Sequence, residues 1–159
     1  MNMEWQLKQR LQIGRHCWII AVHCDEYHII QVEYLKHPAK ELKPQNMLAE
    51  ETARQIKAYC RKPRGFVFEL PLVSAKTGHQ RKTRAAIQNI PGGQTRTYGE
   101  IAHEIRSSAR AVGGACRANE IPFLVPCHRV VAADGLGGFM GSEGDESHIK
   151  TALLEYESA

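Results

Sequence analysis

Long hydrophobic runs and a secretion signal are both missing from this chain. No apolar stretch among its 159 residues approaches the ~20 residues that span a bilayer. The first residues, Met1–Lys8, carry no apolar segment of the kind that directs secretion. We therefore expect no membrane partner, and a cytoplasmic protein, or a nuclear one if the cell has a nucleus.

A disulfide framework and a zinc motif are missing as well. The five cysteines are odd in number, none forms a Cys-x-x-Cys pair, and in a reducing compartment free thiols are expected. One stretch near the N-terminus combines histidine and cysteine, but successive residues of a strand point to opposite faces of a sheet. We therefore expect no metal there, although the stretch contains His16, Cys17, His23, Cys24 and His28.

Repeats and low-complexity segments are also absent. Hydrophobic residues make up 43% of the chain and charged residues 24%, as in folded soluble proteins. The length allows one ordinary domain or two small ones that share a core. The net charge of +4 is unevenly spread, because between Lys76 and Arg117 eight basic residues accompany only two acidic ones. This basic middle predicts a polyanion on one face, with a merely solvated basic surface as the alternative.

The first 74 residues resemble a supporting sheet with one helix. The β-branched stretches Trp18–Val22 and Ile29–Leu35 predict strands, and residues 65–72 predict another strand that a proline closes. A helix is expected after Asn46. Its buried face should contain Leu48, Thr52, Ile56 and Tyr59.

The second half is mostly helical. Thr77 and Gln80 have the spacing of a capping box, as do Thr97 and Glu100, and each pair predicts the first turn of a helix. A last helix is expected at residues 147–156, where apolar residues recur with helical spacing.

A third helix, expected after Ser107-Ser108 from Ala109 to about Ala118, has an unusual composition. Small residues dominate it, and Gly113 and Gly114 each cost up to ~1 kcal/mol relative to alanine. With the preceding short helix it forms a helix-turn-helix pattern. A small-faced helix with Arg110 near its start suits shape-based docking in the minor groove of DNA; tight helix–helix packing is the alternative.

The stretch from residue 121 to 131 places a thiol beside an imidazole between prolines. Pro122 and Pro126 lack an N–H, so this stretch is neither a helix interior nor a central strand. If Pro126 occupies the first position of a short helical turn, Cys127 lies at the positive end of that turn, where a thiolate is favoured. We interpret Cys127, next to His128, as a nucleophile; a core thiol with a coincidental neighbour is the alternative.

Several sequence motifs together resemble one protein family. Tyr98, the segment Arg110–Ala115, Asn119, the run Pro126-Cys127-His128-Arg129-Val130 and the tail Lys150–Glu157 are similar to the O6-alkylguanine-DNA alkyltransferases (methylated-DNA–protein-cysteine methyltransferases). The resemblance is weak in the first half of the chain and strong in the second half.

The resemblance implies an α+β fold. A small antiparallel sheet with a helix, the ribonuclease H-like supporting domain of residues 1–74, would pack on a mostly helical, winged-helix-like domain of residues 75–159 that contains the helix-turn-helix. It implies direct-reversal repair of O6-alkylguanine in double-stranded DNA: the damaged base is flipped out, and one alkyl (methyl) group moves irreversibly to the protein in a single turnover. No cofactor and a monomer are implied, with cooperative assembly on DNA left open.

The resemblance also implies roles for residues. Cys127 would be the acceptor, His128 would take its proton through a water molecule, and Glu157 would orient the imidazole. Asn119 would shape the pocket, and Tyr98 would direct its O–H toward guanine. Arg110 would enter the base stack in place of the flipped nucleotide. The other expected DNA or guanine contacts are Ala111, Gly113, Gly114, Val130, Phe139 and Met140, whereas Arg129 and Lys150 are expected to make structural ion pairs.

The sequence departs from the family pattern around the expected pocket. Glu120 and Phe139 replace a usual proline and tyrosine, His79 and Arg84 replace a usual phenylalanine and tryptophan, and the loop 141–148 is longer. We expect these departures to affect pocket size and the alkyl groups accepted. Two other functions stay open: a DNA-binding reader in which the cysteine is only structural, and a multiple-turnover Cys-His hydrolase, which would leave the basic stretch unexplained.

Overall fold

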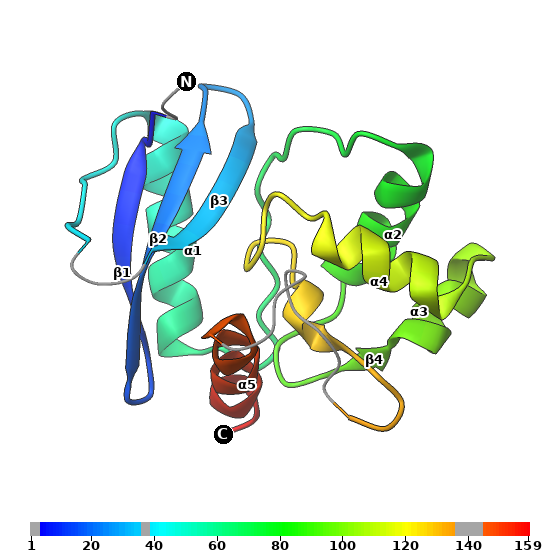
Figure 1. Ribbon diagram of the computed structural model, residues 1–159. Coiled ribbons are helices and arrows are strands. Elements are labelled where there is room, and N and C mark those ends of the chain that lie inside the picture. The colour runs from blue at the N-terminus through cyan, green and yellow to red at the C-terminus, as the bar shows by residue number, and fades with distance from the viewer. Residues whose placement is uncertain (1–3, 36–38, 136–144) are drawn as a thin grey trace.

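The computed structural model describes residues 4–35, 39–135 and 145–159. Helices outnumber strands after the first third of the chain (Figure 1). The elements are β1 (Leu7–Ile13), β2 (His16–Cys24), β3 (Ile29–Leu35), α1 (Met47–Arg61), α2 (Gly78–Gln88), β4 (Arg96–Thr97), α3 (Tyr98–Ile105), α4 (Ala109–Arg117), the 3-10 turn η1 (Cys127–Arg129), β5 (Val130–Val131) and α5 (Asp145–Ser158).

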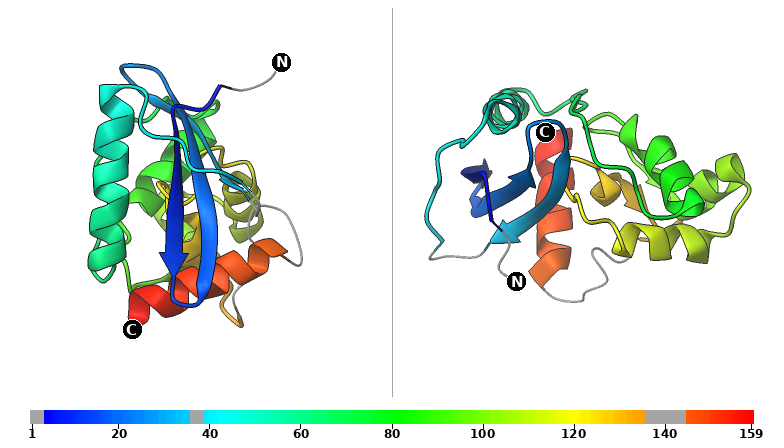
Figure 2. Two further views of the ribbon diagram at one scale, coloured as in Figure 1. Left: turned by 90° about the vertical axis from the view of Figure 1, so that its left-hand side faces the viewer. Right: turned by 90° about the horizontal axis from the view of Figure 1, so that it is seen from above.

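The N-terminal sheet is antiparallel, with strand order β1-β2-β3, and α1 covers one of its faces (Figures 1 and 2). The predicted strands correspond to β2 and β3, but β1 was not predicted. Leu7, Leu11 and Ile13 are buried at alternating positions of β1, as a half-buried strand requires. The apolar alternation is interrupted in the sequence, because the position between Leu7 and Leu11 on the same face is the polar Gln9, whose side chain donates to the carbonyl of Ala53 on α1.

The strand predicted at residues 65–72 is wrong. This segment touches the sheet through one bridge, between Leu72 and Ile29. At Glu69 its backbone forms hydrogen bonds with a side chain instead of a strand. The side chain of Gln55 donates to the carbonyl of Glu69 and accepts from its amide, both at 2.9 Å. An extended, apolar segment can therefore pack on the core without joining the ladder of a sheet.

The helix starts follow their capping residues. Asn46 caps α1 by accepting from the amide of Ala49, and the predicted buried face of α1 is buried. Both predicted capping boxes are confirmed, at the N-terminus of α2 and of α3. Ser108 caps α4. These caps satisfy amide groups that a helix leaves unpaired in its first turn.

Helices α2, α3 and α4 pack together on one side of the molecule, and α5 lies between them and the sheet (Figures 1 and 2). The turn between α3 and α4 passes through Arg106, whose φ of 57° ends α3 in the left-handed region. The two helices form the predicted helix-turn-helix, and the α+β fold class is confirmed. Helix α5 is longer than predicted, and residues 145–148 of the expected loop belong to it.

No helix among residues 4–35, 39–135 and 145–159 has the length and apolarity needed to cross a membrane.

Candidate active site

A fully buried loop carries the cysteine–histidine pair into the centre of the protein. Every residue from Ile121 to Val130 is buried. Phe123 has a φ of 73°, which is strained for a bulky side chain. Its ring makes an edge contact with the ring of Tyr59 on α1 at a centroid distance of 5.0 Å, and with Phe68 at 5.1 Å. This packing holds the loop in a conformation that the backbone alone would not favour.

Cys127 begins the turn η1, with 3% of its surface exposed. Pro126 precedes this turn instead of occupying its first position, and the amide of Cys127 donates to the carbonyl of Val125 at 2.8 Å. Cys127 therefore lies at the N-terminal end of the turn, as predicted, although Pro126 stands one position earlier than expected. The backbone amide of Cys127 is the smallest of the effects that lower the pKa of its thiol. The side-chain amide of Asn119 donates to Sγ at 3.3 Å. Burial raises the pKa of the Cys127 thiol, and Asn119 and Lys150 oppose this effect only in part.

His128 and Glu157 form a buried pair. Nε2 of His128 lies 2.8 Å from Oε2 of Glu157, and neither side chain is exposed. Burial lowers the pKa of His128, although Glu157 acts in the opposite direction, so the imidazole is neutral at pH 7. An ionised carboxylate only accepts hydrogen bonds, so Nε2 carries the hydrogen. Nδ1 is then a lone-pair acceptor, and it has no hydrogen-bond partner among the described residues.

The carboxylate of Glu157 accepts hydrogen bonds from three side chains. Besides His128, Arg129 donates through Nε to Oε1 and through Nη2 to Oε2, both at 2.9 Å. Tyr59 donates its hydroxyl to Oε2 at 2.8 Å. Burial alone would raise the pKa of Glu157, but His128 and Arg129 outweigh it and lower the pKa to about 2. Glu157 is therefore ionised throughout the physiological range.

Arg129 is a structural residue, as predicted. Its side chain is 1% exposed, and Nη1 donates to the carbonyls of Ile90 at 2.7 Å and Phe66 at 3.3 Å. One side chain thus fixes Glu157 and two backbone segments at once.

Lys150 and Tyr98 lie near Val130, at the C-terminal end of the loop. Nζ of Lys150 donates to the carbonyl of Val130 at 2.9 Å and lies 3.4 Å from the hydroxyl oxygen of Tyr98. Val130 is buried, and in β5 it pairs with β4. Burial, with smaller effects from Cys116 and Cys127, raises the pKa of the half-buried Tyr98 to about 12. Its phenol therefore remains a hydrogen-bond donor at neutral pH.

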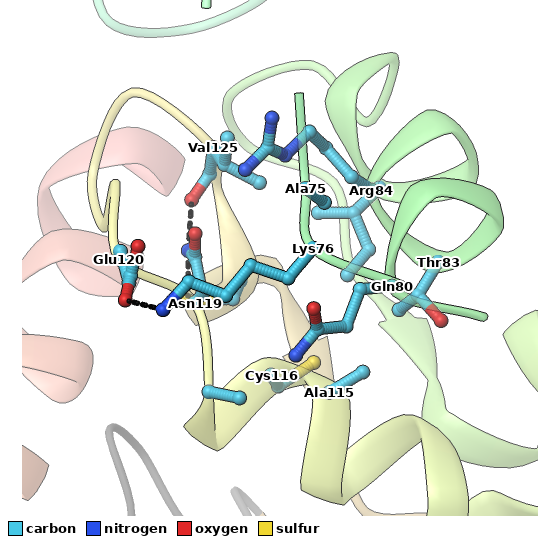
Figure 3. Close-up of a pocket in the computed structure, with 13 residues that line it drawn as sticks. Ala75, Lys76, Gln80, Thr83, Arg84, Ala115, Cys116, Asn119, Glu120 and Val125 are labelled. Carbon is cyan, nitrogen blue, oxygen red and sulfur yellow. Dashed lines mark hydrogen bonds and ion pairs between the residues drawn. The ribbon is translucent and has the colours of Figure 1, made fainter. Parts of the chain in front are cut away.

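A cavity of about 310 Å³ reaches Cys127 from the side of α2 and α4. Figure 3 shows Gln80 and Arg84 on one wall, Cys116 on another, and the ion pair between Lys76 and Glu120 at 2.9 Å. Two departures from the family pattern, Arg84 and Glu120, therefore line this cavity. Its complete lining is Ala75, Lys76, Gln80, Thr83, Arg84, Ile87, Ala115, Cys116, Ala118, Asn119, Glu120, Val125 and Cys127.

The small-residue face of α4 is open. Arg110 and Ala111 are exposed, and Gly113 and Gly114 are half-buried. A Cβ atom added at either glycine would meet, among the described residues, only the guanidinium of Arg117, at 4.0 Å. Tight helix–helix packing, the alternative explanation of these glycines, is therefore wrong for the part of the chain that the structure describes.

Some expected site residues are not placed. Phe139 and Met140 lie outside the described residues. His79, another departure from the family pattern, is not part of the cavity lining, and its Nε2 forms a hydrogen bond with the hydroxyl of Ser107 at 2.7 Å. Within the described ranges, no three His, Cys, Asp or Glu side chains could hold a metal ion together. Tyr59 was predicted only as a core residue, because no sequence motif links it to Glu157, 98 positions away.

The sequence model of a protein family, the DNA-binding domain of 6-O-methylguanine DNA methyltransferase, matches residues 78–159. These residues include the helix-turn-helix, the cysteine loop and α5. The chain belongs to this family. A methylated-DNA–protein-cysteine methyltransferase of Methanopyrus kandleri is 37% identical over 123 residues, covering 77% of this chain and 87% of the relative.

Two further matches are informative. A DNA base-flipping protein of Thermus thermophilus is 39% identical over 114 residues, covering 70% of this chain and 75% of that protein. The crystal structure of Mycobacterium tuberculosis OGT in complex with DNA has a TM-score of 0.70 and 31% identity, covering 88% of this chain and 86% of that one.

Proposed function

We propose that this protein repairs DNA by direct reversal. It transfers one alkyl group, such as methyl, from O6-alkylguanine in double-stranded DNA to Cys127, irreversibly and once per molecule. The observation that carries the proposal is the pair formed by a buried thiol and the neutral imidazole beside it, whose Nδ1 is left as an acceptor. We further propose that the protein acts as a monomer in the cytoplasm, or in the nucleus of a eukaryotic cell.

The transfer is a displacement at carbon. The proton of Cys127 passes through a water molecule to Nδ1 of His128, and Glu157 stabilises the imidazolium that forms. Sγ, which accepts a hydrogen bond from Asn119, then forms a bond to the alkyl carbon while the bond from that carbon to O6 breaks. The electron pair of the broken bond stays on O6, which accepts a hydrogen bond from Tyr98. The guanine takes up one proton from water, and His128 returns to water the proton that it took from Cys127, so the protons balance. A thiolate suits this step because it is the softest nucleophile among the side chains.

The surface around the helix-turn-helix supports DNA as the carrier of the substrate. Arg110 and Ala111 are exposed on α4, and of the described side chains only that of Arg117 comes within 4.0 Å of a Cβ atom added at Gly113 or Gly114. A duplex can thus approach the backbone of α4 closely in its minor groove. In this proposal, residues 1–74 are the supporting domain, and residues 75–159 bind DNA and hold the acceptor.

The test is a single-turnover reaction followed by mass spectrometry of the intact protein. After incubation with a duplex that contains O6-methylguanine, we expect each folded molecule to gain the mass of one methyl group, located on Cys127 by peptide mapping. The reaction should stop at one equivalent, because the C–S bond is not broken again.

The same measurement separates the other two functions. A DNA-binding reader would bind the duplex while its own mass stays unchanged, and a hydrolase would turn over many equivalents of an acyl substrate. A folded protein that binds the lesion and gains no mass would refute alkyl transfer.

Arg110 offers a test of base flipping. Arg110→Ala is expected to slow methyl transfer from a duplex by roughly ten- to a hundredfold, because unstacking a base costs a few kcal/mol that an inserted side chain offsets. Transfer from the free base O6-benzylguanine should be unaffected, since no stack is opened. Rapid-quench kinetics on both substrates measure the difference. Arg15→Ala, in the turn between β1 and β2, removes the same charge far from α4 and should change neither rate; equal losses on both substrates in Arg110→Ala would contradict the flipping role.

A further inference from the structure

The hydroxyl group of Tyr59 connects α1 directly to the histidine–glutamate pair. Tyr59 is fully buried, and its oxygen lies 2.8 Å from Oε2 of Glu157. The same Oε2 atom accepts from Nε2 of His128 at 2.8 Å. Burial and the charge of Glu157 hold the pKa of Tyr59 well above its ordinary value. The phenol is therefore always the donor in this bond.

We infer that Tyr59 is a positioning residue for alkyl transfer: through Glu157, its hydroxyl sets how strongly His128 holds a proton. The inference rests on the proposed function, because His128 is the base of that reaction. It assigns to the N-terminal half of the chain an effect on the chemistry, exerted through Glu157, in addition to its supporting role.

The physical reason is the sharing of one carboxylate oxygen. Each donor to an ionised oxygen takes up part of its negative charge. If the Tyr59 donor is removed, Oε2 interacts more strongly with a protonated His128. Because a nearby negative charge raises the pKa of a histidine, the pKa of His128 should rise. At a given acidic pH, less neutral base is then present, and transfer slows.

Other charged groups face the pair but stay unchanged in such an experiment. Arg129 and Lys150 both lower the pKa of His128. Tyr34, on β3, is within electrostatic range of Glu157. A shift that follows removal of one oxygen atom from Tyr59 is therefore due to the bond to Glu157.

The ring of Tyr59 has a separate structural role, which Tyr59→Phe preserves. It packs against Phe66, Phe68 and Phe123 with centroid distances of 5.8, 5.9 and 5.0 Å. Tyr156 provides a matched control. Its ring lies 6.1 Å from that of Tyr59, but its hydroxyl donates to the carbonyl of Cys60 and not to Glu157.

The experiment measures the rate of transfer from free O6-benzylguanine to the full-length parent, Tyr59→Phe and Tyr156→Phe, from about pH 5 to about pH 8. The free base removes any effect on DNA binding. For Tyr59→Phe, we expect the acid limb of the rate profile to move to higher pH by about half a unit to one unit, as loss of a charge-assisted hydrogen bond predicts. The profile of Tyr156→Phe should match that of the parent.

If the parent reacts and the pH–rate profile of Tyr59→Phe coincides with that of the parent, the inference is wrong and the proposed function stands. The same holds if the acid limb of Tyr156→Phe shifts as much as that of Tyr59→Phe. A parent that takes up no benzyl group would overturn the proposed function and the inference with it. If Tyr59→Phe does not fold, 3-fluorotyrosine at position 59 replaces it. This more acidic phenol donates more strongly, so the acid limb should move to lower pH, and an unmoved limb would refute the inference.

Discussion

Cys127→Ser is expected to abolish alkyl transfer completely while the protein stays folded and still binds DNA. The serine hydroxyl ionises far less readily than a thiol, and its oxygen is a harder, weaker nucleophile toward carbon. In the buried site it can still accept the hydrogen bond that Asn119 donates to Sγ. The loss should therefore lie in the chemical step. Intact-protein mass spectrometry after incubation with an O6-methylguanine duplex measures transfer, and a gel-shift titration measures binding.

A second cysteine variant shows whether this loss is specific. Cys17 is half-buried on β2, and Cys17→Ser should react as fully as the parent protein. Cys127→Ala repeats the test without a hydroxyl group. If Cys127→Ser or Cys127→Ala takes up a methyl group, another side chain is the acceptor, and the proposed mechanism is wrong.

The helical half of the fold could be predicted because its signals are local. A cap and its partner are three residues apart, so the boxes at Thr77 and Thr97 specify where α2 and α3 begin. The residues that form the Cys127–His128 pair are neighbours in the chain, and the prolines around them indicated an irregular segment. In contrast, β1 depends on pairing with β2, and no residue within β1 indicates that partner.

The network behind the imidazole could be predicted only in part. The resemblance to the family pointed to Glu157 as the partner of His128, and the structure places them together. Tyr59 could not be connected to this pair, because its contact depends on how α1 packs against the end of α5. The prediction of a strand at residues 65–72 was wrong for a related reason. Its apolar composition correctly indicated burial, but its backbone pairs with β3 at Leu72 alone, and the side chain of Gln55 pairs with the backbone of Glu69.

Arg129→Met is expected to destabilise the fold by about 3 to 5 kcal/mol, because it leaves a buried carboxylate without its main counter-ion. Glu157 would keep only the donors His128 and Tyr59, and the carbonyls of Ile90 and Phe66 would each lose a donor. Domains of this size are stable by roughly 5 to 15 kcal/mol, so the variant should unfold at much lower urea concentration. Chemical denaturation at pH 7 measures the change.

Two further variants show whether the unpaired charge causes this loss. Arg54→Met removes an exposed ion pair with Glu51 on α1 and should cost less than about 1 kcal/mol. The double variant Arg129→Met/Glu157→Gln removes both charges and should be more stable than Arg129→Met alone, because a neutral amide is less costly to bury than an unpaired carboxylate. If the double variant is no more stable, the cost comes from the lost carbonyl contacts of Arg129 and not from the charge of Glu157.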